Sequence, residues 1–216
     1  MSIAIFVGPT FPFGQIHDYL HIPATIFPPI KRGDIEMLAA DYEIIVIVDG
    51  VFHSTLSVSA REILLALKEK TIYGCSSMGA LRAAELDKFG MIGVGEVYKM
   101  YADRTIVSDG EVALLFDPIT YENMTVPLVN VRFALTQAVR HQAINQETCD
   151  YLLEVARNMH YTELDYLSII KKASQNTNEA SYEAFLKYLN LNLDGLDLKR
   201  KDAIELIDKL NFSFKS

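Results

Sequence analysis

Short runs of apolar residues mark the first half of the chain. The clearest are Ile3–Val7, Ala24–Phe27, Ile44–Val48 and Thr71–Tyr73, and glycine, proline or charged residues separate them. Runs of this length without a regular polar alternation are typical of strands that are buried on both faces of a parallel sheet. A further strand is expected at Val112–Phe116.

Patterns with a helical period lie between and after these runs. Asp34–Ala40 is one candidate helix, and Ser59 precedes another, in which Glu62 stands where a capping box requires it. From Pro127 onward, apolar residues recur at helical spacing. The stripes are Leu128, Val131, Leu135 and Ala138; Leu152, Val155, Ala156 and Met159; and Ala203, Leu206, Ile207 and Leu210.

This order of elements predicts an α/β fold, with a mostly parallel sheet flanked by helices and followed by a helical C-terminal layer. We expect residues 1–126 to form the α/β core. Residues 127–216 would form a helical part packed on or beside that core. A chain of 216 residues, 50% of them hydrophobic, is long enough to bury such a core.

Composition narrows the class of protein. The formal net charge of −8 disfavours binding to nucleic acid, whose backbone is itself anionic. The longest aliphatic run, Ile44–Val48, is far shorter than the roughly 18 residues that would indicate a membrane span. The two cysteines, Cys75 and Cys149, follow neither a metal-ligand nor a disulfide pattern. We therefore expect a cytoplasmic protein that binds neither membranes nor a structural metal.

Candidate chemistry is concentrated in a predicted turn between a strand and a helix. The strand breaks at Gly74, and the spacing Cys75-x-Ser77-x-Gly79 is close to the pattern of a nucleophile elbow. Backbone N–H groups that open a helix have no partners within it, so they can hold an anion or an oxyanion. Ser77 is the candidate nucleophile, and Cys75 is its rival because a thiolate is intrinsically more reactive.

Other polar residues are expected at the same edge of the sheet. Ligands of parallel α/β sheets bind outside the carboxyl ends of the strands, and Thr10, Asp49 and His53 all follow predicted strands. Histidine can act as a general base near neutral pH, although His53 can equally be a solvated loop residue. The candidate catalytic residues are therefore Ser77, His53 and Asp49. The candidate substrate-binding or oxyanion residues are Thr10, Cys75, Ser76, Met78, Gly79, Arg82, Glu85, Asp109 and Glu111.

Two pairs of charged residues on that list have alternative interpretations. Arg82 and Glu85 stand three residues apart, so they can form a solvated ion pair, or Arg82 can steady an anionic group over the turn. Asp109 and Glu111 can orient a base, bind a cation or simply solvate a turn.

No cofactor site is expected from the remaining motifs. Gly8 and Gly14 lack the Gly-Lys-Ser/Thr of a phosphate loop, and the glycines of Phe89–Gly95 are not in dinucleotide-binding order. His17 and His21 are spaced like two metal ligands, but the sequence offers no third ligand nearby.

The motif around the turn closely resembles the core of the TfuA-like proteins. The resemblance extends from about residue 3 to about residue 135. It is carried by Gly74–Leu86, Phe89–Gly95 and Asp109–Ala113, with shorter matches at Gly8–Thr10, Pro28–Pro29, Gly33–Asp34 and Asp49–Phe52.

The resemblance implies a role in peptide or protein backbone thioamidation, beside an ATP-dependent YcaO-type enzyme. Members of the family are associated with hydrolysing a thiocarboxylated ThiS-like carrier protein, which releases sulfide near the partner, and with stimulating the partner. On this view Ser77 attacks the thiocarboxylate carbonyl, backbone N–H groups hold the oxyanion, and Arg82 holds the charged end of the carrier. The peptide or protein substrate would be bound through the partner.

This chain departs from the family pattern at two places. Ala60-Arg61 stands where the family often carries histidine and lysine, and Gly110 stands where it often has a second acid. If either position supplies the family's base or acid, another group such as His53 must replace it, or activity has been lost. The alternatives to an accessory hydrolase are a non-catalytic adaptor that activates the YcaO-type enzyme and, on elbow spacing alone, a small serine esterase.

Overall fold

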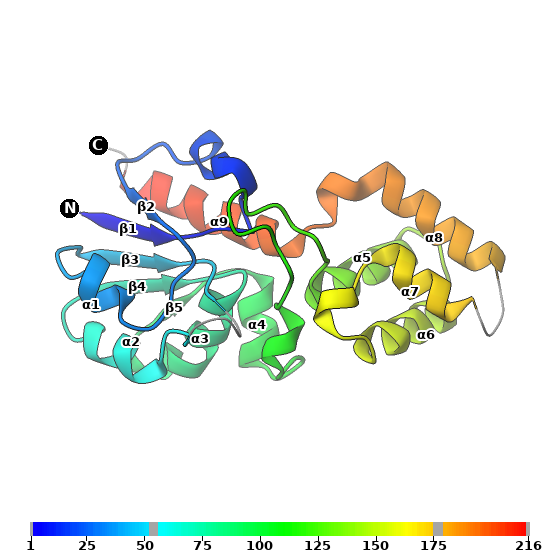
Figure 1. Ribbon diagram of the computed structural model, residues 1–216, viewed down its shortest axis with the longest axis horizontal. Coiled ribbons are helices and arrows are strands. Elements are labelled where there is room, and N and C mark those ends of the chain that lie inside the picture. The colour runs from blue at the N-terminus through cyan, green and yellow to red at the C-terminus, as the bar shows by residue number, and fades with distance from the viewer. Residues whose placement is uncertain (1, 52–55, 175–178, 215–216) are drawn as a thin grey trace. The chain divides into compact units, whose positions relative to one another are not determined.

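The computed structural model describes residues 2–51, 56–174 and 179–214 of the chain (Figure 1). The strands are β1 (Ile3–Phe6), β2 (Thr25–Phe27), β3 (Ile44–Ile47), β4 (Thr71–Gly74) and β5 (Ile92–Gly93). The α-helices are α1 (Asp34–Leu38), α2 (Ala60–Ala66), α3 (Met78–Leu86), α4 (Glu96–Ala102), α5 (Leu128–Arg140), α6 (Gln146–Arg157), α7 (Tyr166–Ala173), α8 (Glu179–Asn192) and α9 (Leu198–Ser213). Short 3-10 helices are η1 (Pro12–Asp18), η2 (Asp87–Phe89), η3 (Asp109–Glu111), η4 (Tyr161–Glu163) and η5 (Leu193–Gly195).

The chain forms two compact units. The first contains Met1–Asp109, Pro118–Glu122 and Lys199–Ser216, and the second contains Gly110–Asp117 and Asn123–Leu198. The sequence analysis placed all of 127–216 in one helical part, whereas these units assign α9 from Lys199 onward to the first. The apolar residues of α9 explain this division, because Ala203, Leu206 and Ile207 are buried in the core of the first unit.

The first unit is built on a five-stranded sheet with the order β2-β1-β3-β4-β5, in which every neighbouring pair is parallel. The predicted α/β fold with a parallel sheet is confirmed. Strand β5 was not predicted because it comprises two residues within a glycine-rich run, where Ile92 pairs with Tyr73. The order places β1 and β3 where the chain changes direction across the sheet, which is the usual ligand-binding position of such folds.

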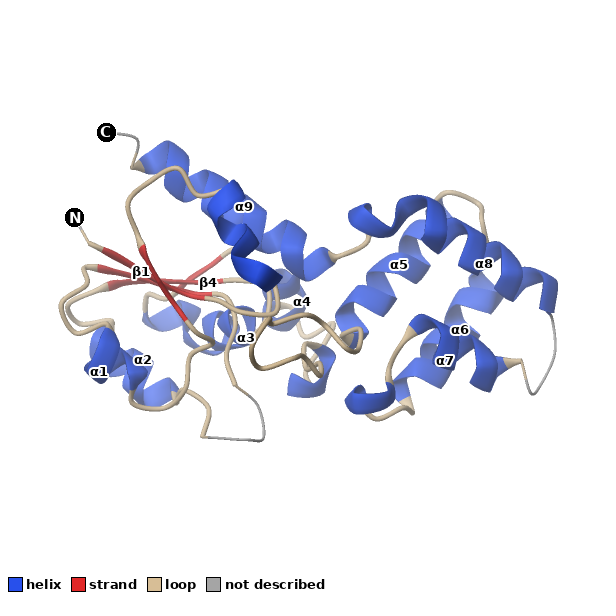
Figure 2. Cartoon of the chain, turned by 45° about the horizontal axis from the view of Figure 1, so that its top comes forward, coloured by secondary structure: helices blue, strands red, loops and turns tan. Residues whose placement is uncertain are grey.

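Helices cover both faces of this sheet (Figure 2). Ile5 and Val46 point to the face that packs against α9, whereas Ile45, Ile47 and Ile72 point to the face covered by α1, α2 and α3. Alternate residues of one strand therefore enter two different cores. This arrangement explains why the strands are apolar throughout and lack the polar alternation of a half-exposed strand.

The described part of the second unit is helical, which agrees with the predicted C-terminal helices. Helices α5 to α8 share a core that includes Leu135, Leu152, Ile169 and Phe185. Asn145 caps α6 by accepting a hydrogen bond from the Thr148 N–H. Asp165 caps α7 in the same way, and such caps satisfy donors that a helix leaves unpaired.

Two local predictions were wrong. Val112–Phe116 does not form a strand; it makes an isolated antiparallel bridge between Phe116 and Asn123. Ser59 does cap α2 by accepting from the Glu62 N–H at 3.2 Å, but the Glu62 carboxylate does not complete a capping box. It accepts instead from the N–H groups that begin α1, because that helix lies beside α2.

None of the described helices combines the length and the apolar character needed to span a membrane.

Candidate functional site

Asp49 is the central acceptor at the carboxyl edge of the sheet. It follows β3, and its Oδ2 accepts hydrogen bonds from the backbone N–H groups of Gly8 at 3.0 Å and Thr10 at 2.9 Å. Its Oδ1 accepts from the Thr10 hydroxyl at 2.8 Å. Both residues are buried. A buried carboxylate is costly unless it is hydrogen-bonded, so these three donors fix the loop after β1 onto the end of β3.

Thr10 in turn contacts the turn after β4. Its Oγ1 lies 3.2 Å from Oγ of Ser76. A threonine hydroxyl has one proton, and Thr10 donates it to the Asp49 carboxylate, so the Ser76 hydroxyl is the donor in this second bond. The result is an ordered chain from Ser76 through Thr10 to Asp49. Its members come from three adjacent strand ends, as the sequence analysis expected for Thr10 and Asp49.

The turn holds Ser76 in an unusual backbone conformation. Ser76 has φ 65°, the left-handed region that residues other than glycine rarely adopt, and its side chain is fully buried. Such a conformation costs about 1–3 kcal/mol and persists when the surroundings enforce it. Here the start of α3 lies directly against β3: a Cβ on Gly79 would stand 1.7 Å from the Ile47 carbonyl oxygen.

Ser77 is placed differently from Ser76. It is the residue before α3, with φ −114° and ψ −119°, and its side chain makes no capping hydrogen bond to that helix. Its N–H donates to the Cys75 carbonyl at 2.8 Å, and the Gly79 N–H donates to the Val48 carbonyl at 3.3 Å. Among the described residues, the N–H groups of Ser76 and Met78 have no acceptor and are available to hold an oxyanion.

Cys75 lies in an environment that opposes nucleophilic chemistry. It is fully buried in the core between the sheet and α9. Burial raises the pKa of its thiol well above the ordinary value, and the nearby carboxylates of Asp202, Asp49 and Glu205 raise it further. A thiol with a raised pKa supplies little thiolate, so the structure favours a serine over Cys75 as the nucleophile.

The charged residues of α3 are engaged with each other. Arg82 Nε donates to the Val58 carbonyl at 3.0 Å, and the guanidinium pairs with Glu85 at 2.5 Å. Arg82 therefore attaches α3 to the segment that leads into α2. Within the described residues it makes no hydrogen bond to Ser76 or Ser77.

The two acidic residues of η3 belong to different units. Asp109 ends the first long segment of the first unit and is exposed. Glu111 is buried in the second unit and forms a bidentate pair with Arg132, with N–O distances of 2.7 and 2.8 Å. His53, the predicted base, lies outside the described residues.

The sequence analysis did not identify one buried acid, Asp202 of α9. Its carboxylate accepts from the N–H groups of Glu96 at 2.9 Å and Val97 at 2.7 Å, at the start of α4. Desolvation raises its pKa to about 7, and the charges of Glu205 and Glu96 act in the same direction, whereas the two N–H groups lower it. Gly95 is the sequence signal of this contact, since a Cβ there would lie 2.3 Å from Asp202 Cγ.

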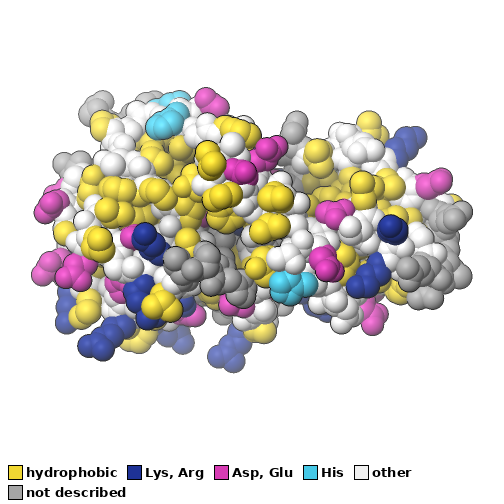
Figure 3. Space-filling view, viewed as in Figure 1, with side chains coloured by type: hydrophobic (Ala, Val, Ile, Leu, Met, Phe, Trp, Pro, Cys, Tyr) yellow, Lys and Arg dark blue, Asp and Glu magenta, His cyan; other side chains and the backbone are white. Residues whose placement is uncertain are grey.

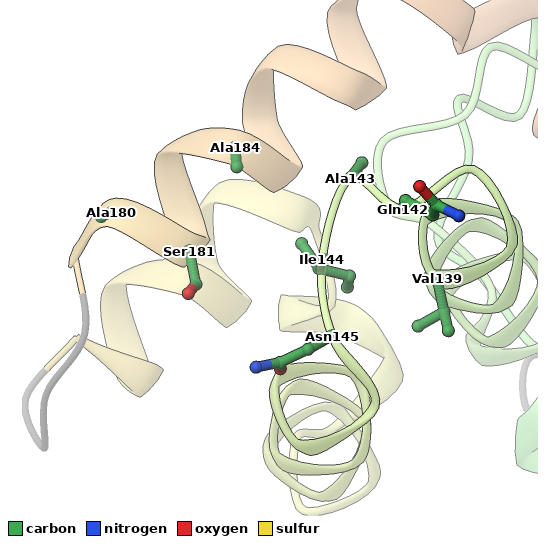
Figure 4. Close-up of a pocket in the computed structure, with 8 residues that line it drawn as sticks. All are labelled: Val139, Gln142, Ala143, Ile144, Asn145, Ala180, Ser181 and Ala184. Carbon is green, nitrogen blue, oxygen red and sulfur yellow. The ribbon is translucent and has the colours of Figure 1, made fainter.

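Among the described residues, a pocket in the second unit and the charged surface of the first offer no comparable cluster of reactive groups. A cavity of about 560 Å³ in the second unit lies between α5, α6 and α8, and aliphatic, amide and hydroxyl side chains line it, Ile144, Asn145 and Ser181 among them (Figure 4). No group of three or more potential metal ligands occurs in the described ranges. In the first unit, exposed side chains of both charges lie around α1 and α2 (Figure 3); Lys31, Arg32 and Arg61 are among the basic ones, and Glu36 and Glu69 among the acidic ones.

The arrangement at the sheet edge is suited to acyl transfer. It offers buried hydroxyl groups, a carboxylate that can receive a proton through Thr10, and free N–H groups in the same turn.

Comparison with known families gives a match to the family described as TfuA-like protein over residues 49–164, slightly more than half of the chain. The match includes Asp49 and the whole turn. No curated protein matches the sequence.

Proposed function

This chain belongs to the TfuA-like protein family, whose members are associated with thioamide formation, and from this premise we propose that it is an accessory hydrolase of backbone thioamidation. Its substrate is a ThiS-like carrier protein that ends in a thiocarboxylate. Hydrolysis releases sulfide beside a YcaO-type ATP-dependent partner, which places the sulfur in a peptide or protein.

One observation supports hydrolysis over a purely adaptor role. The hydroxyl groups of Ser76 and Thr10 and the carboxylate of Asp49 form a buried, ordered chain at the β1/β3 switch point. Hydrophobic residues in these positions would stabilise the fold at lower cost, because buried polar groups must be fully hydrogen-bonded. A hydroxyl backed by a proton acceptor is a recurring arrangement for covalent catalysis.

The reaction proceeds in two steps. A serine hydroxyl of the turn attacks the carbonyl carbon of R–CO–S⁻, an O–C bond forms, the C–S bond breaks, and the hydroxyl proton leaves with the sulfur as HS⁻. Water then cleaves the acyl ester, giving R–COO⁻, the free serine and one proton. The sequence pattern assigns the attack to Ser77.

Charge stabilisation is the main demand of this substrate. A thiocarboxylate is already an anion, so attack on its carbonyl concentrates further negative charge on oxygen. The N–H groups of Ser76 and Met78 are donors for that oxygen.

The test is sulfide release from a purified thiocarboxylated carrier, with Asp49→Asn as the matched variant. The wild-type protein should release sulfide, and Asp49→Asn should be slower by roughly 10²-fold or more, because the proton acceptor is lost. Stimulation of the YcaO-type partner is measured separately with free sulfide as donor. An adaptor would stimulate the partner under those conditions while releasing no sulfide from the carrier, and that result would reject the hydrolase.

A further inference from the structure

We propose that Ser76, and not Ser77, is the residue that becomes acylated. This assignment deepens the proposed hydrolysis and rests on it. The spacing Cys75-x-Ser77-x-Gly79 selects Ser77 in the sequence, but the backbone selects its neighbour.

The first argument is the position of the sharp turn. β4 ends at Gly74 and α3 begins at Met78, and of the residues between them Ser76 has positive φ. In a nucleophile elbow, the nucleophile occupies the strained position between strand and helix. The strained residue of this turn is therefore Ser76, one position before the serine that the spacing selects, although Met78 stands where the elbow pattern has a glycine.

The second argument is the fate of the hydroxyl proton. Ser76 Oγ lies 3.2 Å from Thr10 Oγ1, which donates to Asp49 at 2.8 Å. When Ser76 attacks, its proton passes to Thr10 as the Thr10 proton passes to Asp49. Among the described residues, no hydrogen bond links the Ser77 hydroxyl to such a path, and its side chain does not cap α3.

The third argument is the retention of a side chain where glycine would be more stable. A glycine would adopt φ 65° without strain, but the residue at this position is a serine, and its side chain is fully buried. A serine that served only to fill space would not need to be strained. Phe13, Arg104, Tyr121 and Gln142 also have positive φ, but none of these four is buried, whereas Ser76 combines the strain with a buried hydroxyl at the sheet edge.

The step balances as follows. The Ser76 oxygen bonds to the thiocarboxylate carbon, and the proton rests on Asp49 by way of Thr10 while the tetrahedral intermediate exists. When the C–S bond breaks, the proton returns from Asp49 to Thr10, whose hydroxyl gives it to the departing sulfur, and HS⁻ leaves. Water then attacks the ester, Ser76 recovers a proton, and the carrier leaves as the carboxylate with release of one proton.

The experiment locates the acyl group. The wild-type protein is mixed with thiocarboxylated carrier, quenched in acid, digested and analysed by fragmentation mass spectrometry, which separates adjacent serines. We expect the ester on Ser76 in the wild-type protein and in Ser77→Ala, whatever the rate of that variant. Ser76→Cys should carry a thioester at position 76.

A pair of substitutions separates chemistry from folding. Ser76→Gly removes the hydroxyl and relaxes the backbone, whereas Ser76→Ala removes it and keeps the strain. Both should lose sulfide release by roughly 10³-fold or more, while Ser76→Gly should melt at a higher temperature than Ser76→Ala, because the glycine variant alone relieves the strain of positive φ.

The outcomes distinguish the two proposals. An ester on Ser77, a thioester on Cys75, or undiminished sulfide release by Ser76→Gly would overturn the assignment while hydrolysis stands. Failure of the wild-type protein to release sulfide would overturn the proposed hydrolysis, and the assignment with it.

Discussion

Asp49 binds Thr10 twice, through the backbone N–H at 2.9 Å and the side-chain hydroxyl at 2.8 Å, although the two residues are 39 positions apart in the chain. The backbone contact fixes the loop after β1. The hydroxyl contact orients the Thr10 oxygen so that it can accept from Ser76. One carboxylate thus makes both a structural contact and the hydroxyl contact on which the proposed reaction depends, and suitable substitutions separate the two.

Thr10→Val is the first such substitution. Valine has nearly the shape of threonine and keeps the backbone N–H, so the loop remains attached. The Ser76 hydroxyl, however, loses its acceptor and the path to Asp49. We expect sulfide release from the carrier to fall by roughly 10²-fold, with a loss of about 1–3 kcal/mol in the free energy of unfolding from the lost hydrogen bond.

Thr10→Ser is the matched control, because it restores the hydroxyl. It should recover most of the rate lost in Thr10→Val. Equal rates in the two variants would show that the Thr10 oxygen takes no part in proton transfer.

Gly79 is expected to be indispensable for folding of the turn. A Cβ at this position would lie 1.7 Å from the Ile47 carbonyl oxygen, and backbone cannot move aside as a flexible side chain can. We expect Gly79→Ala to lower the free energy of unfolding by more than about 3 kcal/mol, or to prevent folding. Urea denaturation followed by circular dichroism measures this change.

Gly195→Ala provides the comparison for Gly79→Ala. Nothing lies within 4 Å of a Cβ built there, and the substitution is chemically the same. Its midpoint should stay close to that of the wild-type protein. Similar losses in both variants would contradict the steric explanation.

Glu111 and Arg132 are expected to stabilise the second unit as a pair. Their bidentate contact is mostly shielded from water, with side-chain exposures of 8% and 13% respectively. Removing one partner leaves a buried charge unpaired, so Glu111→Leu should cost about 3–5 kcal/mol. The double variant Glu111→Leu with Arg132→Met should be more stable than Glu111→Leu alone. A double variant whose loss equals the sum of the two single losses would refute the coupling.

The sequence predicted the sheet more accurately than the site. Apolar runs identify β1 to β4 because each strand is buried on both faces and must exclude polar residues. The parallel arrangement of the strands is enough to predict that Thr10 and Asp49 lie at the same edge of the sheet. The positive φ of Ser76 could not be predicted, since spacing does not reveal which residue of a turn adopts it. Contacts over long separations, such as Asp202 with the start of α4, leave no local pattern either.

Asp202 gives a prediction for the dependence of stability on pH. Burial raises its pKa in the folded protein to about 7, above the ordinary value of 3.8, so the folded state holds this proton more tightly than the unfolded state. The stabilisation that it contributes is therefore fully present below the unfolded pKa, near 3.8, and is lost as pH rises through about 7.

Asp202→Asn removes this titration while keeping the size of the side chain. The urea midpoints of both proteins are measured from pH 4 to pH 8. The wild-type protein should lose more stability over that range than the variant, because every other ionisable group is the same in the two proteins and its effect cancels in the difference. Parallel profiles would mean that Asp202 is ionised throughout, and that its hydrogen bonds to the N–H groups of Glu96 and Val97 outweigh its burial.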